Sequence, residues 1–283
     1  MATKKAAPEA ADASILVPLL SQKRISVAIC GQTPLILNRL AEKARQQLLL
    51  PSLRKNSAER AVTLKHEPID EFRSAAYVLD NPSDTLLCVP GGAIKAAMAD
   101  AAKDLPGKVA AAQIGRLTTV PVEMVGVYGI PKILMSVVRN SDINRTPDIR
   151  SRCILERWCL VFPVAFITPN LSDAAIVRLL AAAGMIRGIG DFRVEKGAGS
   201  YGQFRVCDPD DEEFVEIRKQ GGRKVQEQAM HEPLAYNAET QELLSWFGEE
   251  VQRRRQQAAD TPKKGKRGKA DAPDESELAT EAA

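Results

Sequence analysis

The glycine-rich segment from Gly188 to Phe204, read GIGDFRVEKGAGSYGQF, holds the residues best suited to binding chemistry. Five glycines lie within these seventeen positions, with Arg193 and Lys196 between them and Tyr201 near the end. Glycine lets a backbone approach a ligand closely and adopt positive φ. Arg and Lys match phosphate groups, and an aromatic ring can stack on a base. The segment therefore favours nucleic-acid contact, and a glycine-rich hairpin with a solvated basic face is the alternative.

Gly197, Gly199 and Gly202 also have the G-x-G-x-x-G spacing of a nucleotide-binding loop. A dinucleotide fingerprint must follow a strand and open a helix, because the helix N-terminus holds the pyrophosphate. Here a helical pattern precedes the glycines and the strand-like QFRVCD follows them. No VAIK-like strand, H-R-D or D-F-G motif accompanies them as in a kinase. We therefore interpret Gly197 and Gly199 as backbone contacts to a nucleic acid.

A second cationic stretch is RNSDINRTPDIRSR, residues 139–152, which has almost no apolar residue and is expected to be a loop. Its arginines are Arg139, Arg145, Arg150 and Arg152. Guanidinium groups match phosphate oxygens bidentately, so these four are candidate phosphate contacts. A merely solvated loop is the alternative. The prediction depends on the two cationic stretches converging in space.

Residues for catalysis are scarce. The sequence contains no G-x-S-x-G or H-E-x-x-H motif, and its two histidines, His66 and His231, stand in polar surroundings and are expected to be solvated. Asp142 and Asp148 could assist metal-dependent RNA cleavage, but we interpret them as residues that shape turns and balance charge. We expect no catalytic residue.

The cysteines form no C-x-x-C pair and several lie in apolar runs, which indicates buried, reduced thiols. They are Cys30, Cys88, Cys153, Cys159 and Cys207. With only two histidines in the chain, a Cys/His zinc site is not expected, and we predict neither a metal nor a cofactor.

The net charge of +3 conceals a segregation along the chain. Residues 21–207 hold 25 Lys and Arg against 16 Asp and Glu, whereas residues 208–283 hold 12 against 18. A basic body with an acidic C-terminal region is typical of a polyanion binder whose tail competes for its own site. An ordinary basic domain with a solubilising tail is the alternative. The sequence has no apolar run of membrane-spanning length and no secretory signal, so we expect a soluble cytoplasmic protein without a membrane partner.

Hydrophobic periodicity predicts the secondary structure. Strands are expected at 24–30, 77–79, 86–89, 118–125, 133–138, 154–167 and 204–207, and helices at 41–50, 70–76, 93–103, 174–185 and 238–257. Ser172 or Asp173 can cap the helix that begins at 174, and Pro163 indicates an edge position or a bulge. This order indicates an α+β fold with helices on one face of a largely antiparallel sheet, and the split β-α-β arrangement is the simplest candidate.

Composition divides the chain into four parts. Residues 1–20 are expected to be a disordered arm and residues 21–207 the core with its inserted loops. Residues 208–259 form an acidic, partly helical extension, and residues 260–283 a disordered tail that is first basic and then acidic.

Several motifs resemble known families. A helix followed by G-x-G-D-F-R, EKGAGSYGQF and a strand resembles the C-terminal glycine-rich loop of the RAMP superfamily. That superfamily has ferredoxin-like RNA-binding folds and includes the backbone subunit of CRISPR effector complexes. Four further motifs are similar to a family of phage and prophage proteins: PLILN (34–38), EFRSAAY (71–77), VPGGAIKAAM (89–98) and RSRCILERW (150–158).

The resemblance implies a ferredoxin/RRM-like core over residues 22–207 and many copies aligned along one strand, each gripping a few nucleotides. Residues 139–152 would be an inserted arm and residues 190–202 would border the groove. The chain lacks a histidine near its glycine loop, unlike a subunit that processes CRISPR RNA, which argues against endonuclease activity.

We therefore predict a non-catalytic protein that binds single-stranded nucleic acid and forms a homo-oligomer or filament along it. It would be phage-encoded, act in the cytoplasm of the bacterial host cell, and serve replication or recombination, with DNA favoured over RNA. An RNA-binding backbone subunit of a CRISPR-like complex and a virion structural protein are the alternatives.

Overall fold

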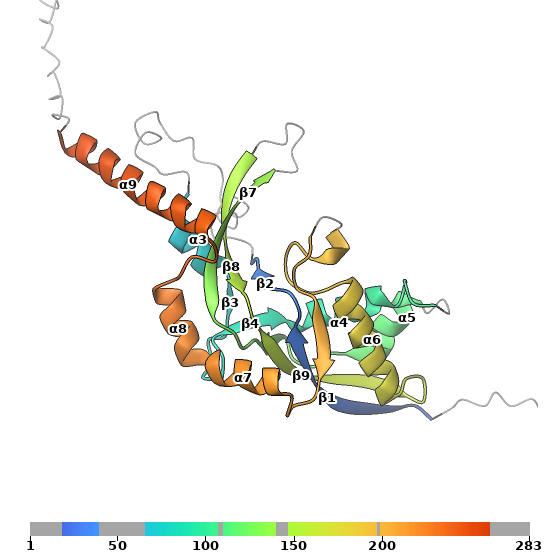
Figure 1. Cartoon of the computed structure of the whole chain (residues 1–283). Helices are drawn as coiled ribbons and strands as arrows, with labels where there is room; N and C mark the ends of the chain where they lie inside the picture. The colour runs from blue at the N-terminus through green and yellow to red at the C-terminus, as the bar shows by residue number, and fades with distance from the viewer. Residues whose placement is uncertain (1–18, 40–65, 107–109, 140–146, 197–198, 261–283) are drawn as a thin grey trace, which may run out of the picture. The chain divides into compact units, whose positions relative to one another are not determined.

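Four antiparallel strands form the main sheet, in the order β10-β1-β9-β5 (Figure 1). They are β1 (Ser21–Gly31), β5 (Thr118–Thr119), β9 (Cys159–Thr168) and β10 (Phe204–Cys207). Helices α4 (Gly91–Ala101) and α5 (Ala111–Leu117) lie between β1 and β5 in the chain, and α6 (Asp173–Ile186) lies between β9 and β10. The computed structural model, which describes residues 19–39, 66–106, 110–139, 147–196 and 199–260, therefore has the expected α+β class.

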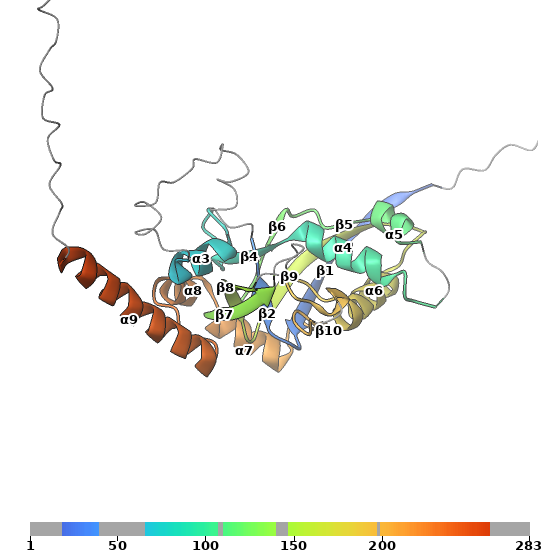
Figure 2. The ribbon, with the colours of Figure 1, turned by 90° about the horizontal axis from the view of Figure 1, so that it is seen from above.

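Strand β1 shows why this sheet forms. Its residues alternate between the two faces, and it pairs with β9 from Ser21↔Thr168 to Cys30↔Cys159. On one face of the sheet, α6 packs against α4 and β10 (Figure 2). The approach to β10 is close, because a Cβ atom at Gly184 would lie 1.9 Å from the Phe204 carbonyl oxygen. Helix α4 contributes the buried side chains of Ile94 and Met98 to this layer.

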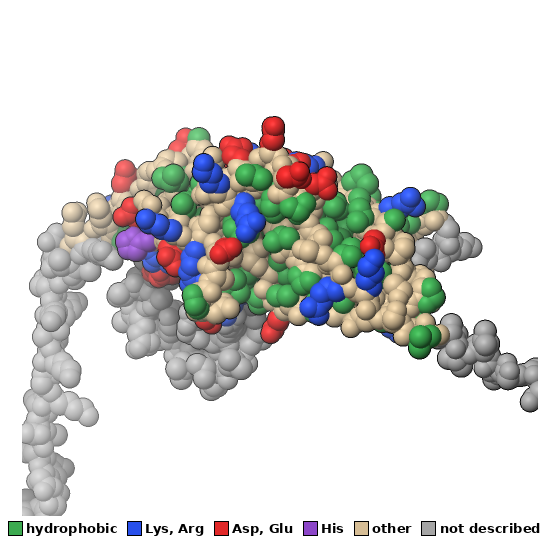
Figure 3. Space-filling model, turned by 90° about the horizontal axis from the view of Figure 1, so that it is seen from below, with side chains coloured by type: hydrophobic (Ala, Val, Ile, Leu, Met, Phe, Trp, Pro, Cys, Tyr) green, Lys and Arg blue, Asp and Glu red, His purple; other side chains and the backbone are tan. Residues whose placement is uncertain are grey.

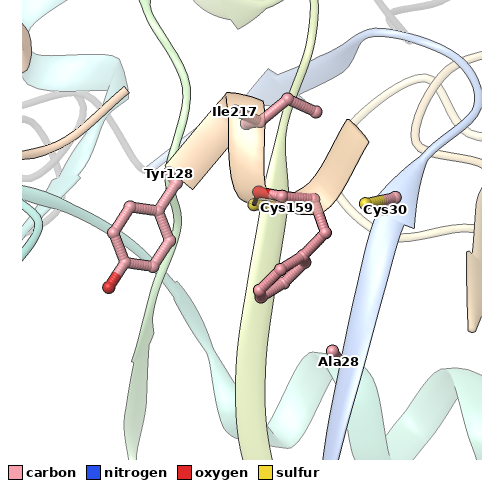
Figure 4. Close-up of a cluster of buried hydrophobic side chains, with 6 residues drawn as sticks. Ala28, Cys30, Tyr128, Cys159 and Ile217 are labelled. Atoms are coloured by element: carbon pink, nitrogen blue, oxygen red, sulfur yellow. Dashed lines mark hydrogen bonds between the residues drawn. The ribbon is translucent and has the colours of Figure 1, made fainter. Parts of the chain in front are cut away.

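Helix α7 (Glu212–Gln220) covers part of the opposite face of the main sheet. Phe214 and Ile217 pack on Ala28 and Cys30 of β1 and on Cys159 of β9 (Figure 4). The prediction that helices lie on one face only is therefore wrong. Without α7, the apolar residues on this side of β1 and β9 would be open to water, which costs about 25 cal/mol per Å² of apolar surface.

Two three-stranded sheets accompany the main sheet. The first has the order β2-β8-β7, with β2 (Leu35–Leu37), β7 (Pro131–Arg139) and β8 (Pro147–Leu155). The second has the order β3-β4-β6, with β3 (Tyr77–Val78), β4 (Leu87–Pro90) and β6 (Met124–Gly126). Helix α3 (Pro68–Ala75) packs on β8 and β7.

The expected loop at residues 139–152 is largely β-strand. Strands β7 and β8 pair antiparallel from Pro131↔Leu155 to Arg139↔Pro147, so only residues 140–146 lie outside the described part of this stretch. A polar strand can form here because its partner strand supplies the backbone hydrogen bonds, whether or not one face is apolar.

Two expected strands are divided. The strand expected at 154–167 belongs to two sheets, because β8 ends at Leu155 and β9 begins at Cys159. The strand expected at 118–125 is interrupted around Pro121, between β5 and β6. Pro163 pairs with Ser26, and β5 pairs only with Ala165 and Phe166 on the other side of β9. The missing N–H of Pro163 therefore falls where β9 behaves as an edge, as expected.

Other predictions are confirmed. Strand β10 has the expected bounds, and Ser172 caps α6 by accepting a hydrogen bond from the Ala175 N–H at 3.2 Å. The helix expected at 41–50 and most of the two tails lie outside the described residues.

The chain divides into two compact units, residues 1–241 and residues 242–283. The boundary expected at Cys207 falls inside the first unit, which also contains α7 and α8 (Arg223–His231). Helix α9 (Ala238–Asp260) supplies the described part of the second unit, where Glu250 pairs with Arg253 and Arg254 at 2.7 Å. No described helix is both long and apolar enough to cross a membrane.

Candidate nucleic-acid interface

The glycine-rich segment folds back on itself and is bound to β2. The Ile189 N–H donates to the Gly202 carbonyl at 3.0 Å, which joins the two ends of the segment. The Asp191 N–H donates to the Ile36 carbonyl at 2.9 Å, and the Gly202 N–H donates to the Pro34 carbonyl at 2.8 Å. Strand β2 thus lies between β8, its sheet partner, and the glycine-rich segment (Figure 1).

Two glycines make this fold-back possible. Gly202 has φ +74°, and a Cβ atom there would lie 1.8 Å from the Ile189 carbonyl oxygen. A Cβ atom at Gly199 would lie 1.8 Å from the Phe192 carbonyl oxygen. Both positions require glycine because backbone meets backbone within the protein, so close approach of a ligand is not needed to explain them.

Arg152 connects the second cationic stretch to the glycine-rich segment. Its Nη2 atom lies 3.1 Å from Asp191 Oδ2, which also accepts a hydrogen bond from Asn38 Nδ2 at 2.9 Å. The Arg152 side chain is 11% exposed, so it is almost fully buried at this junction. Two stretches distant in sequence therefore meet at one carboxylate.

The surroundings of Arg152 are unusual for a cation. Its Nε atom is buried without a hydrogen-bond partner, and burial lowers the pKa of the guanidinium. Asp191 opposes that shift and the charge of Arg150 adds to it. Arg150 lies two residues earlier in β8, on the same face of the strand, and is exposed. Arg150 is thus the surface-facing member of this pair of arginines.

Arg193 is held within the segment. Its Nε and Nη2 atoms bind Glu195 Oε2 at 2.8 and 2.7 Å, and Nη1 donates to the Gly190 carbonyl at 3.2 Å. Arg187, at the end of α6, pairs with the same glutamate at 3.6 Å and with Asp104. Carboxylates therefore neutralise part of the positive charge expected here.

An aromatic pair lies beside these charges. The ring centroids of Phe192 and Tyr201 are 6.1 Å apart with an interplanar angle of 45°. Tyr201 is half-buried against the cluster of Ile36, Leu134 and Ile154, whereas Phe192 is 44% exposed. Tyr201 is the stacking residue predicted from the sequence, whereas Phe192, an aromatic residue between Asp191 and Arg193, was not predicted as part of the site. Phe192 has φ +49°, a conformation that non-glycine residues rarely adopt.

A cavity of about 160 Å³ opens between the glycine-rich segment and the start of α4. Its lining includes Asn38, Tyr77, Ala93, Asp191 and Arg193. Helix α4 begins after Pro90 with no side-chain cap and no acidic residue in its first turn. The Gly91 N–H donates to the Glu123 carbonyl at 2.7 Å. A helix N-terminus favours negative charge through its dipole, so this wall of the cavity suits an anionic group.

The remaining predicted contacts are described only in part. Arg139 ends β7 and Lys196 ends the 3₁₀ turn Val194–Lys196, and their side chains lie outside the described part of the chain. Arg145 and Gly197 lie outside it altogether.

His66 is not an isolated, solvated histidine. Its Nδ1 atom lies 2.7 Å from Glu71 Oε1 and its Nε2 atom lies 3.0 Å from Asp148 Oδ1. Glu71 Oε2 also accepts a weak hydrogen bond from the Ser151 N–H at 3.4 Å. Because both ring nitrogens bind carboxylates, His66 bridges α3 to β8 and has no nitrogen open to a substrate. Asp142 lies outside the described residues, and His231 is exposed beside Glu232.

One group of described residues has a spacing that could suit a metal: Cys30 Sγ and carboxylate oxygens of Asp211 and Glu213 lie within 4.8 Å of one another. Arg205 already pairs with both carboxylates, at 2.8 and 2.9 Å. A side chain of the protein itself therefore already binds both carboxylates and offsets one of their two negative charges.

Comparisons with protein-family models and with curated proteins find no match for this chain. What the chain does must therefore be inferred from its own residues.

Proposed function

We propose that this protein binds single-stranded nucleic acid at the glycine-rich segment and the adjoining strand β8, without catalysis, and that copies assemble along the strand. The observation that carries the proposal is the junction of Arg152 and Asp191, at 3.1 Å. It joins the two cationic stretches at one surface that also holds an exposed aromatic ring, Phe192. Phosphate contacts and base stacking together are what sequence-tolerant binding of single strands requires.

The topology of the main sheet supports a ferredoxin/RRM-like core. Numbered in chain order within the sheet, its strands lie 4-1-3-2, all neighbours are antiparallel, and helices stand between the first and second and between the third and fourth. This is the order of a β-α-β-β-α-β unit. Strands β6, β7 and β8 would then be an insertion between the second and third strands.

The face of the main sheet opposite α6 lacks aromatic side chains for base stacking in its described strands, and this favours the glycine-rich segment as the binding site. RRM domains stack bases on aromatic side chains of that face. Here the residues of β1 and β9 on this side are small, aliphatic or polar, and examples are Arg24 and Ser26 of β1 and Val161 and Pro163 of β9. Helix α7 covers the part of this face near Cys30. Among the described strands, this face therefore offers no aromatic platform, whereas Phe192 and Tyr201 offer one beside the glycine-rich segment.

The charge distribution indicates few phosphate contacts per copy. Arg152 and Arg193 are paired with carboxylates. Further candidate phosphate contacts are Arg150, which is exposed, the N-terminus of α4, and Arg139, Arg145 and Lys196, whose side chains lie outside the described residues. Several copies along one strand would compensate for weak binding by each. We favour DNA over RNA, and this follows from the resemblance to phage proteins.

Fluorescence anisotropy with labelled single-stranded DNA, single-stranded RNA and duplex DNA, at several salt concentrations, tests the proposal. We expect the single strands to bind more tightly than the duplex. The logarithm of the binding constant should fall with the logarithm of salt by roughly 0.7 per phosphate contact. Arg150→Ala should weaken binding and flatten that slope, and Phe192→Ala should weaken binding with little change of slope, by about 1–3 kcal/mol per stacked base.

Arg178→Ala is the matched control, because Arg178 is an exposed arginine of α6 outside the proposed site. If Arg178→Ala and Arg150→Ala reduced the slope equally, the binding would be an unspecific effect of net charge. Absence of binding to every probe would reject the proposal and leave a virion structural role to be tested in purified particles. Degradation of the labelled strands with Mg²⁺ would instead indicate a nuclease.

A further inference from the structure

Strand β1 has an edge that is only partly paired. On one side it pairs with β9 from Ser21 to Cys30. On the other side β10 pairs only with Ala28 to Gly31. Within the described part of the chain, residues 21–27 of β1 therefore have a strand neighbour on one side only.

The backbone groups at this edge point outward. The Gly31 N–H donates to the Trp158 carbonyl just before β9, and the Gln32 N–H donates to the Gln203 carbonyl just before β10. Successive residues of a strand direct their N–H and C=O groups to alternate sides. Gln22, Arg24 and Ser26 therefore direct theirs away from β9, toward the open edge. Such an edge is a template for another strand.

A groove of about 590 Å³ lies at the inner end of this edge, beside residues 25–28 of β1 and next to β10 and the turn that follows it. Ile25 and Val27 of β1 line it together with Val177, Ala181 and Met185 of α6. Val177 is 39% exposed and Met185 is 58% exposed. Seen from below, hydrophobic side chains gather across the middle of the molecule's face, between scattered charged groups (Figure 3).

The chain carries an apolar segment directly before β1. Residues 14–20 read SILVPLL, and five of these seven are Ile, Leu or Val. Its described end is uncovered, because Leu19 is 92% exposed and Leu20 is 57% exposed. An apolar segment and an apolar groove beside an open strand edge are complementary surfaces.

We propose that residues 14–20 of a second copy bind this edge as an added strand, with Ile15, Val17 and Leu19 in the groove between β1 and α6. Seven residues of strand match the seven unpaired positions of β1. Pro18 would then lie on an edge strand, where a missing N–H is tolerated. Backbone hydrogen bonds give such a strand its affinity, and alternate side chains in the groove give it specificity.

The same chain cannot readily supply this strand to itself. Residues 14–18 could reach the open edge of their own β1 only through a tight reversal at Leu19 and Leu20. Neither residue lies in a turn, and leucine lacks the features that favour hairpin turns. Because each copy offers one donor segment and one groove, exchange in one direction builds an open row of copies. The contact needs no nucleic acid, so its failure is distinguishable from failure of the proposed function.

Light scattering after size-exclusion chromatography of the full chain, without nucleic acid, tests this interface. We expect oligomers whose mass rises with concentration. Val17→Asp should abolish them because it places a charge in the donor segment, residues 14–20. Val177→Asp should abolish them because it places a charge in the groove. Ala10→Asp and Val215→Asp are matched controls, the first just outside the donor segment and the second at an exposed valine of α7, and both should leave the oligomers intact.

Ser26→Pro tests the strand edge itself. It removes an N–H that faces the open side, whereas Ser26→Ala keeps it, so only the proline should dissociate the copies. Mixing Val17→Asp with Val177→Asp should give a complex of two chains and nothing larger, because one intact donor then meets one intact groove. Circular dichroism verifies the fold of each variant. The proposal would be overturned by a protein that is monomeric at all concentrations, or by oligomers that survive both Val17→Asp and Ser26→Pro. It would also be overturned if residues 14–20 occupied the groove of their own chain.

Discussion

The guanidinium of Arg152 and the carboxylate of Asp191 lie 3.1 Å apart and link strand β8 to the glycine-rich segment, with strand β2 between the two elements. The carboxylate has a second donor, Asn38 at the end of β2, so three elements meet at one oxygen atom. The junction gives the candidate interface a defined geometry, because the loop and the strand cannot move independently while the pair is intact.

Arg152→Met should lower the free energy of unfolding by about 1–3 kcal/mol, since among the described residues Asp191 would keep only its bond to Asn38. Chemical denaturation of Arg152→Met, Asp191→Asn and the double variant measures the coupling between the two residues. We expect the double variant to lose less than the sum of the single variants. Additive losses would mean that the ion pair is not the link.

Gly202→Ala should destabilise the protein by at least about 2 kcal/mol, because φ is +74° and the added methyl group would overlap the Ile189 carbonyl. Gly115→Ala is the matched control. Gly115 lies within α5 and a Cβ atom there meets nothing within 4 Å, so alanine should stabilise by about 0.5–1 kcal/mol. Thermal unfolding followed by circular dichroism compares the two, and equal effects would contradict the described loop.

Gln226 is fully buried and connects α8 to the backbone around it. Its Oε1 atom accepts from the Leu86 and Leu87 N–H groups at 2.7 and 3.0 Å, and its Nε2 atom donates to the carbonyls of Val127, Gly129 and Gly221 at 2.8–3.0 Å. Removing it leaves several buried groups unsatisfied.

Gln226→Ala should therefore cost about 3–5 kcal/mol of unfolding free energy. Gln228→Ala, an exposed glutamine in the same helix, should stay within about 0.5 kcal/mol of the wild type. Urea denaturation measures both variants. A small effect at Gln226 would show that α8 is not held in this way.

Asp211 should make stability depend on acid pH. The hydrogen bonds from Arg205 are the main reason why the pKa of the Asp211 carboxyl is lowered to about 2, and the bond from the Phe214 N–H adds to the effect. A depressed pKa in the folded state stabilises the protein above the unfolded value of about 3.9, and this stabilisation is lost as pH falls toward about 2. Asp211→Asn should thus be less stable than the wild type at neutral pH, with the difference vanishing near pH 2. A difference independent of pH would exclude the ion pair as its cause.

The thiols of Cys88, Cys153 and Cys207 should react slowly in the folded protein. Burial raises the pKa of Cys88 to about 11 and raises that of fully buried Cys153 further. Cys207 is half-buried, and burial is the main cause that raises its pKa to about 12. A disulfide reagent at mild alkaline pH should label these thiols only on unfolding, whereas an added Gln228→Cys, on an exposed site, should be labelled at once. Rapid labelling of Cys153 would mean that the sheet of β2, β8 and β7 opens.

Local signals in the sequence predict the regular elements well. The alternation from Arg24 to Cys30 lies within β1, and Ser172 marks the start of α6 because its side chain bonds to the helix. Strand β10 follows from a short β-branched and aromatic run closed by an acidic turn. These features depend on neighbours in sequence, which is why they can be read without the fold.

Features set by distant neighbours could not be read. Residues 147–152 have no apolar alternation, and they form a strand because β7 pairs with them. The inward direction of Arg152 depends on Asp191, and the bridge from His66 to Asp148 joins residues that are 82 positions apart in the chain. The role of α7 is likewise invisible in sequence, because its acidic start suggests a solvated tail.

The pairing of β1 has a consequence for the order in which the protein can be completed during translation. Its first residue pairs with Thr168, and its other partner strand ends at Cys207. The earliest described strand to leave the ribosome must therefore wait for most of the chain before either neighbour is available. Until then its apolar residues are exposed to every other nascent molecule, and a chaperone that shields them should raise the yield of native protein.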